Sequence, residues 1–285
     1  MGTAPPPGTA LGGDRATSVA EREAFRRDGH VCVRGLFDAA EIAVHRDSIV
    51  ETAQATRHET RDLAERDTYG QAFLQCTNLW AVDERVRRFV FAARTARVAA
   101  ELLGADSVHL YHDQALIKEA GGGHTPWHQD QFFWPFPAGA PCTVTAWIPL
   151  HDVDPHVGAL TFASGSHIGG DLGGEAISDE SEISLARLID ERGWATTTHD
   201  PMVVGDATFH AGWTLHRAGP NPTGDDREVM TVIYVAGGTP VTEPASPFQA
   251  FDLAMWLPGL APGDVIGATP PPAEGPPMNP RLWPG

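Results

Sequence analysis

The sequence predicts a mainly β protein with flanking helices, in which the strands form a barrel or a jelly roll. Two observations carry this prediction. After Gly104 the chain contains several short β-like runs, which Gly, Pro and Asp residues interrupt at short intervals. Before Gly104, long stretches have apolar residues at helical spacing. Short strands at such intervals favour a barrel or jelly roll over βαβ units, so we expect helices outside one β core.

Helices are expected in much of the N-terminal part. Ser18 precedes "VAEREAFRRDG", which predicts a capped helix ending at Gly29, and "HVCVRGLF" then alternates like a strand. A second helix is expected from Asp38 over "DAAEIAVHRDSIVETAQA". The segment "DERVRRFVFAARTARVAAELLG" predicts a third helix, because its apolar residues are close to helical spacing and Gly104 provides a stop.

The β-like runs that follow are expected to form the sheets. In chain order they are "SVHLYH", "QALIKEA", "CTVTAWIPLHDV", "GALTFAS", "PMVVGDATFH" and "EVMTVIYVA". The insertion "GGDLGGEAISDESEISLARLIDERG" interrupts them with an acidic loop and a short helix. We expect a disordered leader over residues 1–17, a single domain over 18–240 and a Pro- and Gly-rich C-terminal extension over 241–285.

Composition limits the class of protein. The 285 residues are 42% hydrophobic, which is enough to bury a sizeable core. The net charge of −17 disfavours nucleic acid and anionic membrane surfaces as partners. No apolar run reaches the ~18 residues of a membrane span, the start does not resemble a secretory signal, and three cysteines do not suggest a disulfide framework. We therefore expect a cytoplasmic protein, with no prediction of its oligomeric state.

The stretch "GGHTPWHQDQFFWPF" contains a candidate pair of metal ligands, His128 and Asp130. In a strand, side chains two apart emerge on one face, so both would bind one ion while Gln129 points away. One imidazole and one carboxylate suit Fe(II), if a third ligand comes from elsewhere and the opposite positions stay open. An isolated His-x-Asp is common by chance, so this spacing alone does not establish a metal site.

A second candidate region is "FHAGWTLHRAGPNPTGDDREVMTVIY". His216 ends a β-like run there, and Arg227 begins the next strand after a turn, which would aim both side chains into the barrel. A guanidinium in an apolar interior needs an anion, and its planar fork matches a carboxylate. The alternatives are that His210 and His216 are ordinary strand-end histidines and that Arg227 forms a surface salt bridge with a neighbouring aspartate.

Together these motifs resemble the phytanoyl-CoA dioxygenase family of Fe(II)- and 2-oxoglutarate-dependent oxygenases. The resemblance runs from "FRRDGHVCVRGLF" to "VMTVIYVA" and includes "HQD", "AWIPLHDVD", "GALTFASGSH", "GDATFHAGWTLHRAGPN" and "DDREVMTVIY". It implies a double-stranded β-helix, which is a cupin-like jelly roll. It also implies iron bound by His128, Asp130 and His216, and 2-oxoglutarate bound through Arg227, with Trp147 and Gln75 lining the cofactor pocket.

The resemblance also implies the chemistry. Three protein ligands leave positions for two oxygens of 2-oxoglutarate and for O₂ as co-substrate. Oxidative decarboxylation to succinate and CO₂ would then accompany attack on a substrate C–H bond. Relatives that halogenate carry a small residue in place of the carboxylate, so Asp130 argues against halogenation. The loops "PHVGAL" and "SGSH" depart from the family's pattern.

Aromatic residues next to the metal motif are candidates for substrate contact. Phe133 and Trp134 are expected to wall the mouth of the site, and Trp213 is a candidate for its rim. The competing interpretation is that such residues belong to the core. We expect Lys118 to face solvent. The acidic insertion over residues 170–193 is long enough to close over the mouth as a lid.

The sequence thus predicts a dioxygenase that oxidises an unactivated C–H bond of a small molecule, with the aromatic rim favouring a secondary metabolite. Hydroxylation is the favoured outcome; cyclisation, desaturation and epimerisation follow from the same cofactor chemistry. A non-catalytic metal-binding jelly roll or a hydrolytic cupin is the alternative class. Arg227 argues against that class, because neither needs a buried carboxylate clamp.

Overall fold

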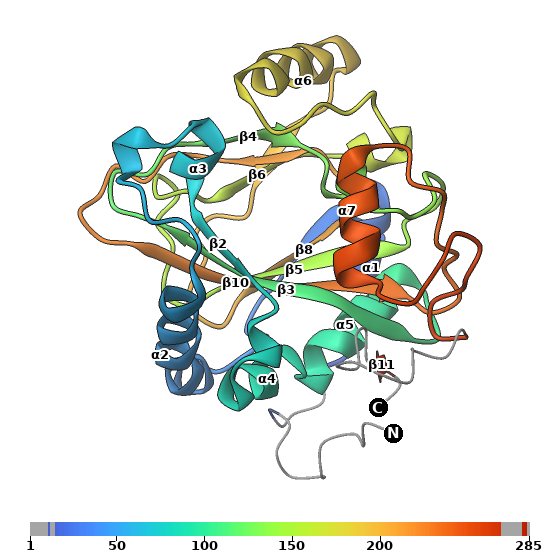
Figure 1. Ribbon diagram of the computed structural model, residues 1–285, viewed down its shortest axis with the longest axis horizontal. Coiled ribbons are helices and arrows are strands. Elements are labelled where there is room, and N and C mark those ends of the chain that lie inside the picture. The colour runs from blue at the N-terminus through green and yellow to red at the C-terminus, as the bar shows by residue number, and fades with distance from the viewer. Residues whose placement is uncertain (1–10, 12–14, 269–280, 284–285) are drawn as a thin grey trace.

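The protein is described by a computed structural model that covers residues 11, 15–268 and 281–283, and its core is two facing antiparallel β-sheets (Figure 1). The larger sheet has the order β1 (His30–Val33), β8 (Ala207–Ala211), β5 (Thr143–Pro149), β10 (Arg227–Ala236), β3 (Val108–Lys118) and β11 (Arg281–Trp283), with β2 (Leu74–Thr77) also paired to β3. The smaller sheet has the order β4 (Thr125–His128), β9 (His216–Ala218), β6 (Leu160–Ala163) and β7 (Thr196–Thr198). This arrangement confirms the predicted jelly roll.

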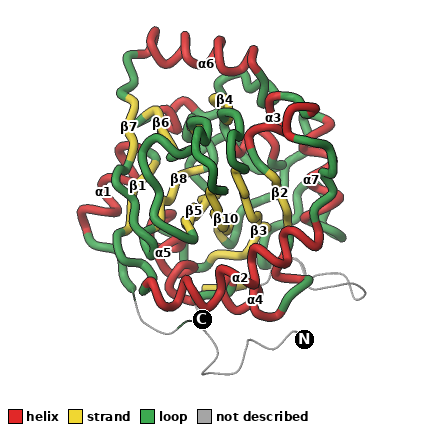
Figure 2. Tube along the Cα trace, turned by 90° about the vertical axis from the view of Figure 1, so that its left-hand side faces the viewer, coloured by secondary structure: helices red, strands yellow, loops and turns green. Residues whose placement is uncertain are grey.

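Helices pack outside the sheets, as Figure 2 shows from the side. The N-terminal helices are α1 (Val19–Asp28), α2 (Ala39–Thr56), α4 (Glu84–Val90) and α5 (Ala93–Leu103), of which α1, α2 and α5 contact strands of the larger sheet and α4 packs on α2. Three more helices, α3 (Thr68–Ala72), α6 (Asp179–Arg192) and α7 (Pro247–Trp256), lie near the smaller sheet or beside the space between the sheets. The short 3₁₀ segments are η1 (Leu63–Glu65), η2 (Leu79–Ala81), η3 (Asp130–Phe133) and η4 (Ser166–Gly169).

Three expected elements differ from the structure. The third expected helix is two helices, α4 and α5, because Ala92 adopts φ −59° and ψ 115° between them. The break lets α4 pack on α2 while α5 packs against α1 and the larger sheet. The runs "SVHLYH" and "QALIKEA" are one strand, β3. Asp113 does not interrupt it, because the buried carboxylate accepts hydrogen bonds from the backbone N–H groups of Leu79 (3.0 Å) and Trp80 (3.2 Å).

Strand β10 shows how the sheet divides two environments. Met230, Val232 and Tyr234 belong to the main apolar core between the larger sheet and the N-terminal helices. Thr231 and Ile233 alternate with them and face the space between the sheets, on the same side as Arg227. The alternation therefore places a structural core on one face of the sheet and a cavity on the other.

The two ends of the chain are described only in part. Residues 1–10 and 12–14 of the expected leader, and residues 269–280 and 284–285 of the expected extension, lie outside the described residues. Thr17 is buried, and its backbone N–H and hydroxyl both donate to the Glu101 carboxylate at 2.6 Å. The extension contributes α7, an element that the composition did not predict.

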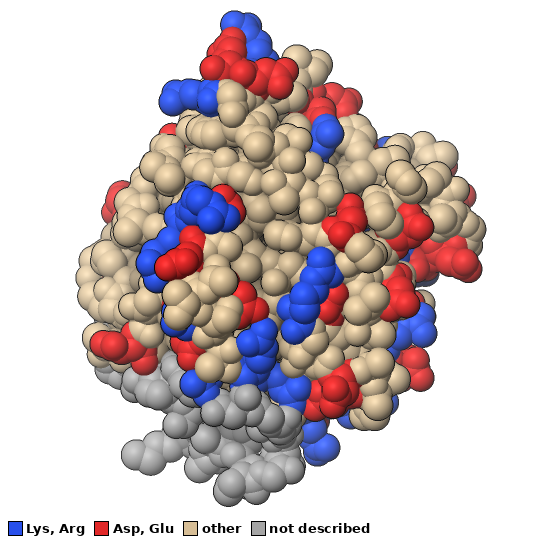
Figure 3. All heavy atoms as spheres, turned by 180° about the vertical axis from the view of Figure 1, so that it is seen from behind, with Lys and Arg blue, Asp and Glu red and all other residues tan. Residues whose placement is uncertain are grey.

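The described helices include none that combines the length and apolarity needed to cross a membrane. On the face opposite to that of Figure 1, acidic and basic side chains are interspersed around a broad uncharged area (Figure 3). The negative net charge is therefore not segregated into a single acidic surface on that side.

Gly29 is a position where only glycine fits. Its φ is +81°, and its carbonyl accepts hydrogen bonds from the Ala211 N–H and the Thr214 hydroxyl, both at 2.8 Å. A Cβ atom there would lie 2.4 Å from His167 Nδ1 and 2.6 Å from Thr214 Oγ1. Gly29 thereby ties the end of α1 to the turn that leads from β8 into β9.

We expect Gly29→Ala to lower the free energy of unfolding by about 2–4 kcal/mol, from left-handed strain plus overpacking. Gly35→Ala is the matched control, because Gly35 has φ +59° but a Cβ atom at that position would have nothing within 4 Å. It should cost only about 1 kcal/mol. Urea unfolding measures both, and equal losses in the two variants would contradict the packing argument.

Candidate metal centre

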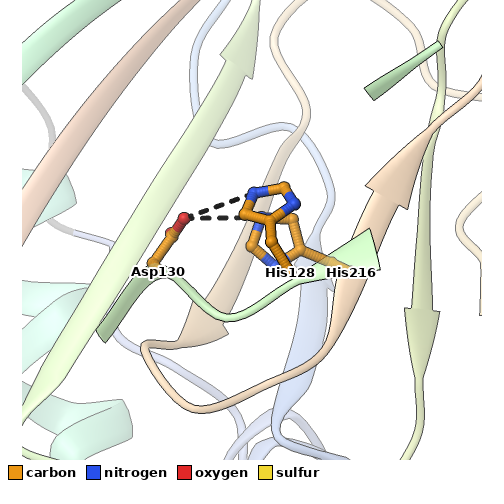
Figure 4. Close-up of side chains that lie close together, drawn as sticks. All are labelled: His128, Asp130 and His216. Carbon is orange, nitrogen blue, oxygen red and sulfur yellow. Dashed lines mark ion pairs between the residues drawn. The ribbon is translucent and has the colours of Figure 1, made fainter. Parts of the chain in front are cut away.

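The pairing of β4 with β9 places two imidazoles side by side. His128 and His216 are register partners, and their ring centroids are 4.1 Å apart. The Nε2 atom of each ring lies 3.6 Å from Oδ1 of Asp130, which begins η3 (Figure 4). One ligand atom from each of these three residues lies within 4.8 Å of the others. The structure therefore brings the three expected metal ligands to one point.

The local backbone differs from the strand expected for His-x-Asp. β4 ends at His128, and Asp130 reaches the same point through the 3₁₀ turn rather than by strand alternation. Gln129 points away, as expected, because its amide donates to the carbonyls of Gly170 (2.9 Å) and Trp213 (2.6 Å). His216 begins β9 instead of ending a strand.

Hydrogen bonds to the backbone orient both histidines for metal binding. Nδ1 of His128 lies 2.7 Å from the Pro126 carbonyl, and Nδ1 of His216 lies 3.0 Å from the Thr214 carbonyl. A carbonyl accepts only, so each Nδ1 carries the proton and each Nε2 presents a lone pair. Burial, followed by the neighbouring imidazole, lowers the pKa of both His128 and His216 to about 4, so both rings are neutral at physiological pH.

Asp130 is held by donors from the larger sheet. Its Oδ2 accepts hydrogen bonds from the Thr145 hydroxyl (2.9 Å) and from His210 Nε2 (3.1 Å), which leaves Oδ1 facing the two ligand imidazoles. Burial by itself would raise the pKa of Asp130, but His216 and His210 outweigh it and hold this pKa well below its ordinary value. The carboxylate is therefore ionised and oriented before any ion binds.

His210 is the residue at this centre whose role the sequence analysis missed. The sequence alone left it as an ordinary strand-end histidine, but it is buried and pairs in register with Thr145. The two Asp130 donors thus come from adjacent positions on β8 and β5. The available signal was the strand spacing in "GDATFHAG", which turns His210 toward the same interior as the ligands.

A cavity of about 780 Å³ opens beside the triad, between the two sheets. The triad, Arg227, Trp147 and Gln75 all line it. Two imidazoles and one carboxylate with open positions facing a cavity form the ligand set of non-haem Fe(II) oxygenases. The donor set therefore fits iron.

Arg227 is a buried cation that faces the cavity. It begins β10, is 1% exposed, and no hydrogen bond or ion pair from the described residues reaches its guanidinium; its Nε is buried and unsatisfied. The centroid of the Trp147 ring lies 5.4 Å from its guanidinium carbon. Burial lowers the pKa of Arg227 to about 9. The alternative of a surface salt bridge with Asp225 or Asp226 is wrong, and the unsatisfied guanidinium fits the carboxylate of 2-oxoglutarate.

Lys118 does not face solvent, contrary to expectation. It is 0% exposed, and its Nζ donates to the Gly123 carbonyl. Lys118 is the register partner of Arg227 on the neighbouring strand. Burial, followed by the charge of Arg227, lowers the pKa of Lys118 to about 7. The turn after β3 folds back over the strand end and covers the side chain, which alternation alone does not reveal.

Comparison with known proteins identifies the class to which this site belongs. The family model described as phytanoyl-CoA dioxygenase matches residues 25–229. The chain belongs to the phytanoyl-CoA dioxygenase family. The triad and Arg227 of this chain fit Fe(II) and 2-oxoglutarate, the two cofactors that the resemblance in the sequence implies.

Three individual proteins illustrate the similarity of this chain to known enzymes. The ectoine dioxygenase of Stutzerimonas stutzeri (strain A1501) is 31% identical over 153 residues, which are 51% of this chain and 49% of that protein. The chain thus spans about half the length of this curated relative. The non-haem alpha-ketoglutarate-dependent epimerase SnoN from nogalamycin biosynthesis is 26% identical, with a TM-score of 0.71 over 92% of this chain and 97% of SnoN. The carbocyclase SnoK, at 22% identity, has the same fold with a TM-score of 0.71 over 90% of this chain and 98% of SnoK.

The expected substrate residues occupy different environments within the family fold. Phe133 lines the cavity. Trp134 also borders it, but it is buried and packs edge-on against Tyr111 at 5.5 Å. Trp213 is buried and is not among the residues that line the cavity.

The expected lid over residues 170–193 has two parts: a Gly-rich segment that reaches the cavity, and helix α6, which is fastened to the smaller sheet. Ala176 and Ile177 line the cavity. The following helix, α6, is fastened to β4 and β9, because the Glu182 carboxylate accepts from the Trp127 N–H (2.9 Å) and from Arg217 (2.6 Å). Movement of α6 would break these contacts, so any closing motion is expected in the Gly-rich segment before it.

We expect Thr145→Val to weaken Fe(II) binding about tenfold, because Asp130 loses one of the two donors that orient it. Thr208→Val is the matched control: Thr208 is also buried in the larger sheet, and its hydroxyl has no hydrogen-bond partner among the described residues. Anaerobic calorimetric titration with Fe(II) measures both variants. Unchanged affinity in Thr145→Val, or equal losses in the two variants, would refute the orienting role.

Proposed function

We propose that the protein uses Fe(II), 2-oxoglutarate and O₂ to oxidise an unactivated C–H bond of a small molecule. The observation that carries this proposal is the position of Arg227, a buried and unsatisfied guanidinium on the cavity that also contains the triad. A structural metal site has no use for such a cation, because an unpartnered buried charge is destabilising. A cofactor that chelates iron and ends in a second carboxylate explains both features.

Each residue has a separate task in this proposal. His128, Asp130 and His216 hold the iron, and Arg227 holds the distal carboxylate of 2-oxoglutarate. Bound iron and 2-oxoglutarate together supply O₂ activation coupled to decarboxylation to succinate. Trp147 and Gln75 line the cofactor's part of the cavity. The chain's own contribution to catalysis is to orient these groups and to exclude water from the oxidant.

Gln75 belongs to a polar strip along the cavity. The Tyr69 hydroxyl donates to Gln75 Oε1 (2.8 Å), and Gln75 Nε2 donates to Gln114 Oε1 (3.0 Å). Gln114 Nε2 continues to Nδ1 of the buried His112 at 3.3 Å, and all four residues line the cavity. These bonds fix the orientation of the Gln75 amide, which supports a positioning role for it.

Hydroxylation is the outcome that requires least of the site beyond the cofactors. Epimerisation is the second candidate, because the SnoN epimerase is similar over 92% of this chain. Cyclisation and desaturation share the same initial hydrogen abstraction. The aromatic lining of the cavity and the similarity to SnoN support a natural-product substrate. Three free cysteines support a reducing, cytoplasmic location.

Anaerobic addition of Fe(II) and 2-oxoglutarate should give a weak visible charge-transfer band, because a keto acid chelates the open face of the iron. His216→Ala should abolish the band. Arg227→Ala should retain iron but require about 100-fold more 2-oxoglutarate, because a buried charged contact is lost. Titration of the band with 2-oxoglutarate measures this change.

Arg217→Ala is the matched control for Arg227→Ala. Arg217 also lines the cavity, but it is paired with Glu182 at 2.6 Å. We expect its 2-oxoglutarate affinity to stay within a few-fold of the parent protein. No band in the parent protein would overturn the proposed function, and equal effects of the two substitutions would remove Arg227 from the cofactor site.

A further inference from the structure

Helix α7 presents an apolar face to the cavity. Phe248, Phe251, Asp252 and Met255 are spaced by three, four and seven residues, so they share one face of the helix, and all four line the cavity. The three apolar members are 44%, 59% and 47% exposed. Large apolar side chains exposed together on one helix face mark a binding surface more often than a solvated one.

This face continues an aromatic wall from the metal motif. Phe133, three residues after the ligand Asp130, packs edge-on against Phe248 with ring centroids 5.4 Å apart. The Gln249 side chain donates to the Phe132 carbonyl (3.1 Å) and fastens α7 to η3. Figure 1 shows α7 across the space between the sheets from α3. The wall is therefore held in place next to the metal centre.

Helix α7 is not part of the matched family region, which ends at residue 229. The groups that hold the cofactors all lie within that region. A cavity wall outside it is suited to distinguish one substrate from another, because it can differ between relatives without disturbing the cofactor site.

Asp252 is the charged member of the wall. Its Oδ2 accepts a hydrogen bond from the buried Tyr111 hydroxyl (2.9 Å), and the Trp256 indole also bonds to the carboxylate. Both donors are neutral, and no ion pair joins Asp252 to a cation in the described part of the chain. An ionised carboxylate has about four acceptor positions, so two donors leave it incompletely satisfied.

The two arginines that line the cavity are committed elsewhere. Arg217 pairs with Glu182, and Arg227 lies at the cofactor end next to Trp147. Burial raises the pKa of Asp252 to about 7, and no positive group offsets this effect. The Asp252 carboxylate therefore has no counter-ion among the described residues, and a positively charged ligand can supply one.

We propose that α7 is the substrate-recognition wall and that Asp252 binds a protonated amine of a ring-bearing substrate. The ring would pack against Phe248, Phe251 and Met255, and the ammonium group would meet the carboxylate beside the Trp256 face, where a cation is also favoured. This inference rests on the proposed function, since it names the substrate class of the same cavity.

Two matched probes test it: naphthylethylamine and naphthylethanol, which share a ring and differ in charge. Each is titrated calorimetrically into protein equilibrated anaerobically with Fe(II) and 2-oxoglutarate, so that no turnover occurs. At about pH 8.5 the carboxylate is ionised and an alkylamine remains protonated. The parent protein should bind the amine about tenfold or more tightly than the alcohol.

Two variants separate the charge of Asp252 from its structural contact. Asp252→Asn removes the charge but can still accept from Tyr111, and it should bind both probes equally. Tyr111→Phe removes the hydrogen bond but keeps the charge, and it should retain the amine preference. Asp264→Asn, an equal change of charge outside the cavity, should behave like the parent protein.

An amine preference that is absent in the parent protein, or that survives Asp252→Asn, overturns the inference. Loss of the amine preference in Asp264→Asn would also overturn the inference, because the preference would then come from the net charge of the protein. The charge-transfer band, recorded on the same samples, reports the cofactors independently. If the parent protein shows a normal band but no preference for the amine, the proposed function stands and the substrate inference fails. If it prefers the amine but shows no band, the proposed function fails and only the amine-binding site remains.

Discussion

The pairing of β4 with β9 is the constraint on which the site depends. It sets His128 opposite His216, and backbone carbonyls two residues before each histidine turn both Nε2 atoms to one point. The third ligand, Asp130, is oriented from the other sheet by Thr145 and His210. The three ligands therefore come from the smaller sheet and the turn after β4, whereas the donors that orient Asp130 belong to the larger sheet, so the packing of the two sheets fixes the geometry before an ion arrives.

Two charged groups without a counter-ion among the described residues organise the rest of the cavity. Arg227 at one position and Asp252 at another both face the cavity and both lack a counter-ion among the described residues. Such groups destabilise an empty site, and a ligand of opposite charge recovers that cost. In this account the cofactor satisfies the cation and the substrate satisfies the anion. In the same account the apolar face of α7 contacts the substrate, and the polar strip from Tyr69 to His112 orients Gln75 in the cofactor's part of the cavity.

The sequence predicted the jelly roll and three candidate ligands that the structure brings together, because short strand patterns and the family's motifs are local signals. It predicted the burial of Arg227 from the strand that begins there. It did not predict the burial of Lys118, because the turn after β3 folds back over the strand end. It did not predict the 3₁₀ turn that carries Asp130 or the donor role of His210, because each depends on a segment far away in the chain. The same holds for α7: Pro and Gly residues around it concealed a helix whose place at the cavity is set by its contacts with η3 and Tyr111.

A crystal structure of the protein grown anaerobically with Fe(II) and 2-oxoglutarate tests the central claim most directly, that this fold orients one ligand set in advance. We expect iron bonded to Nε2 of His128, Oδ1 of Asp130 and Nε2 of His216, with the three side chains essentially unmoved and the distal carboxylate against Arg227. Iron bonded to His210 or to an Nδ1 atom, or a triad that must rearrange to bind it, would contradict the account.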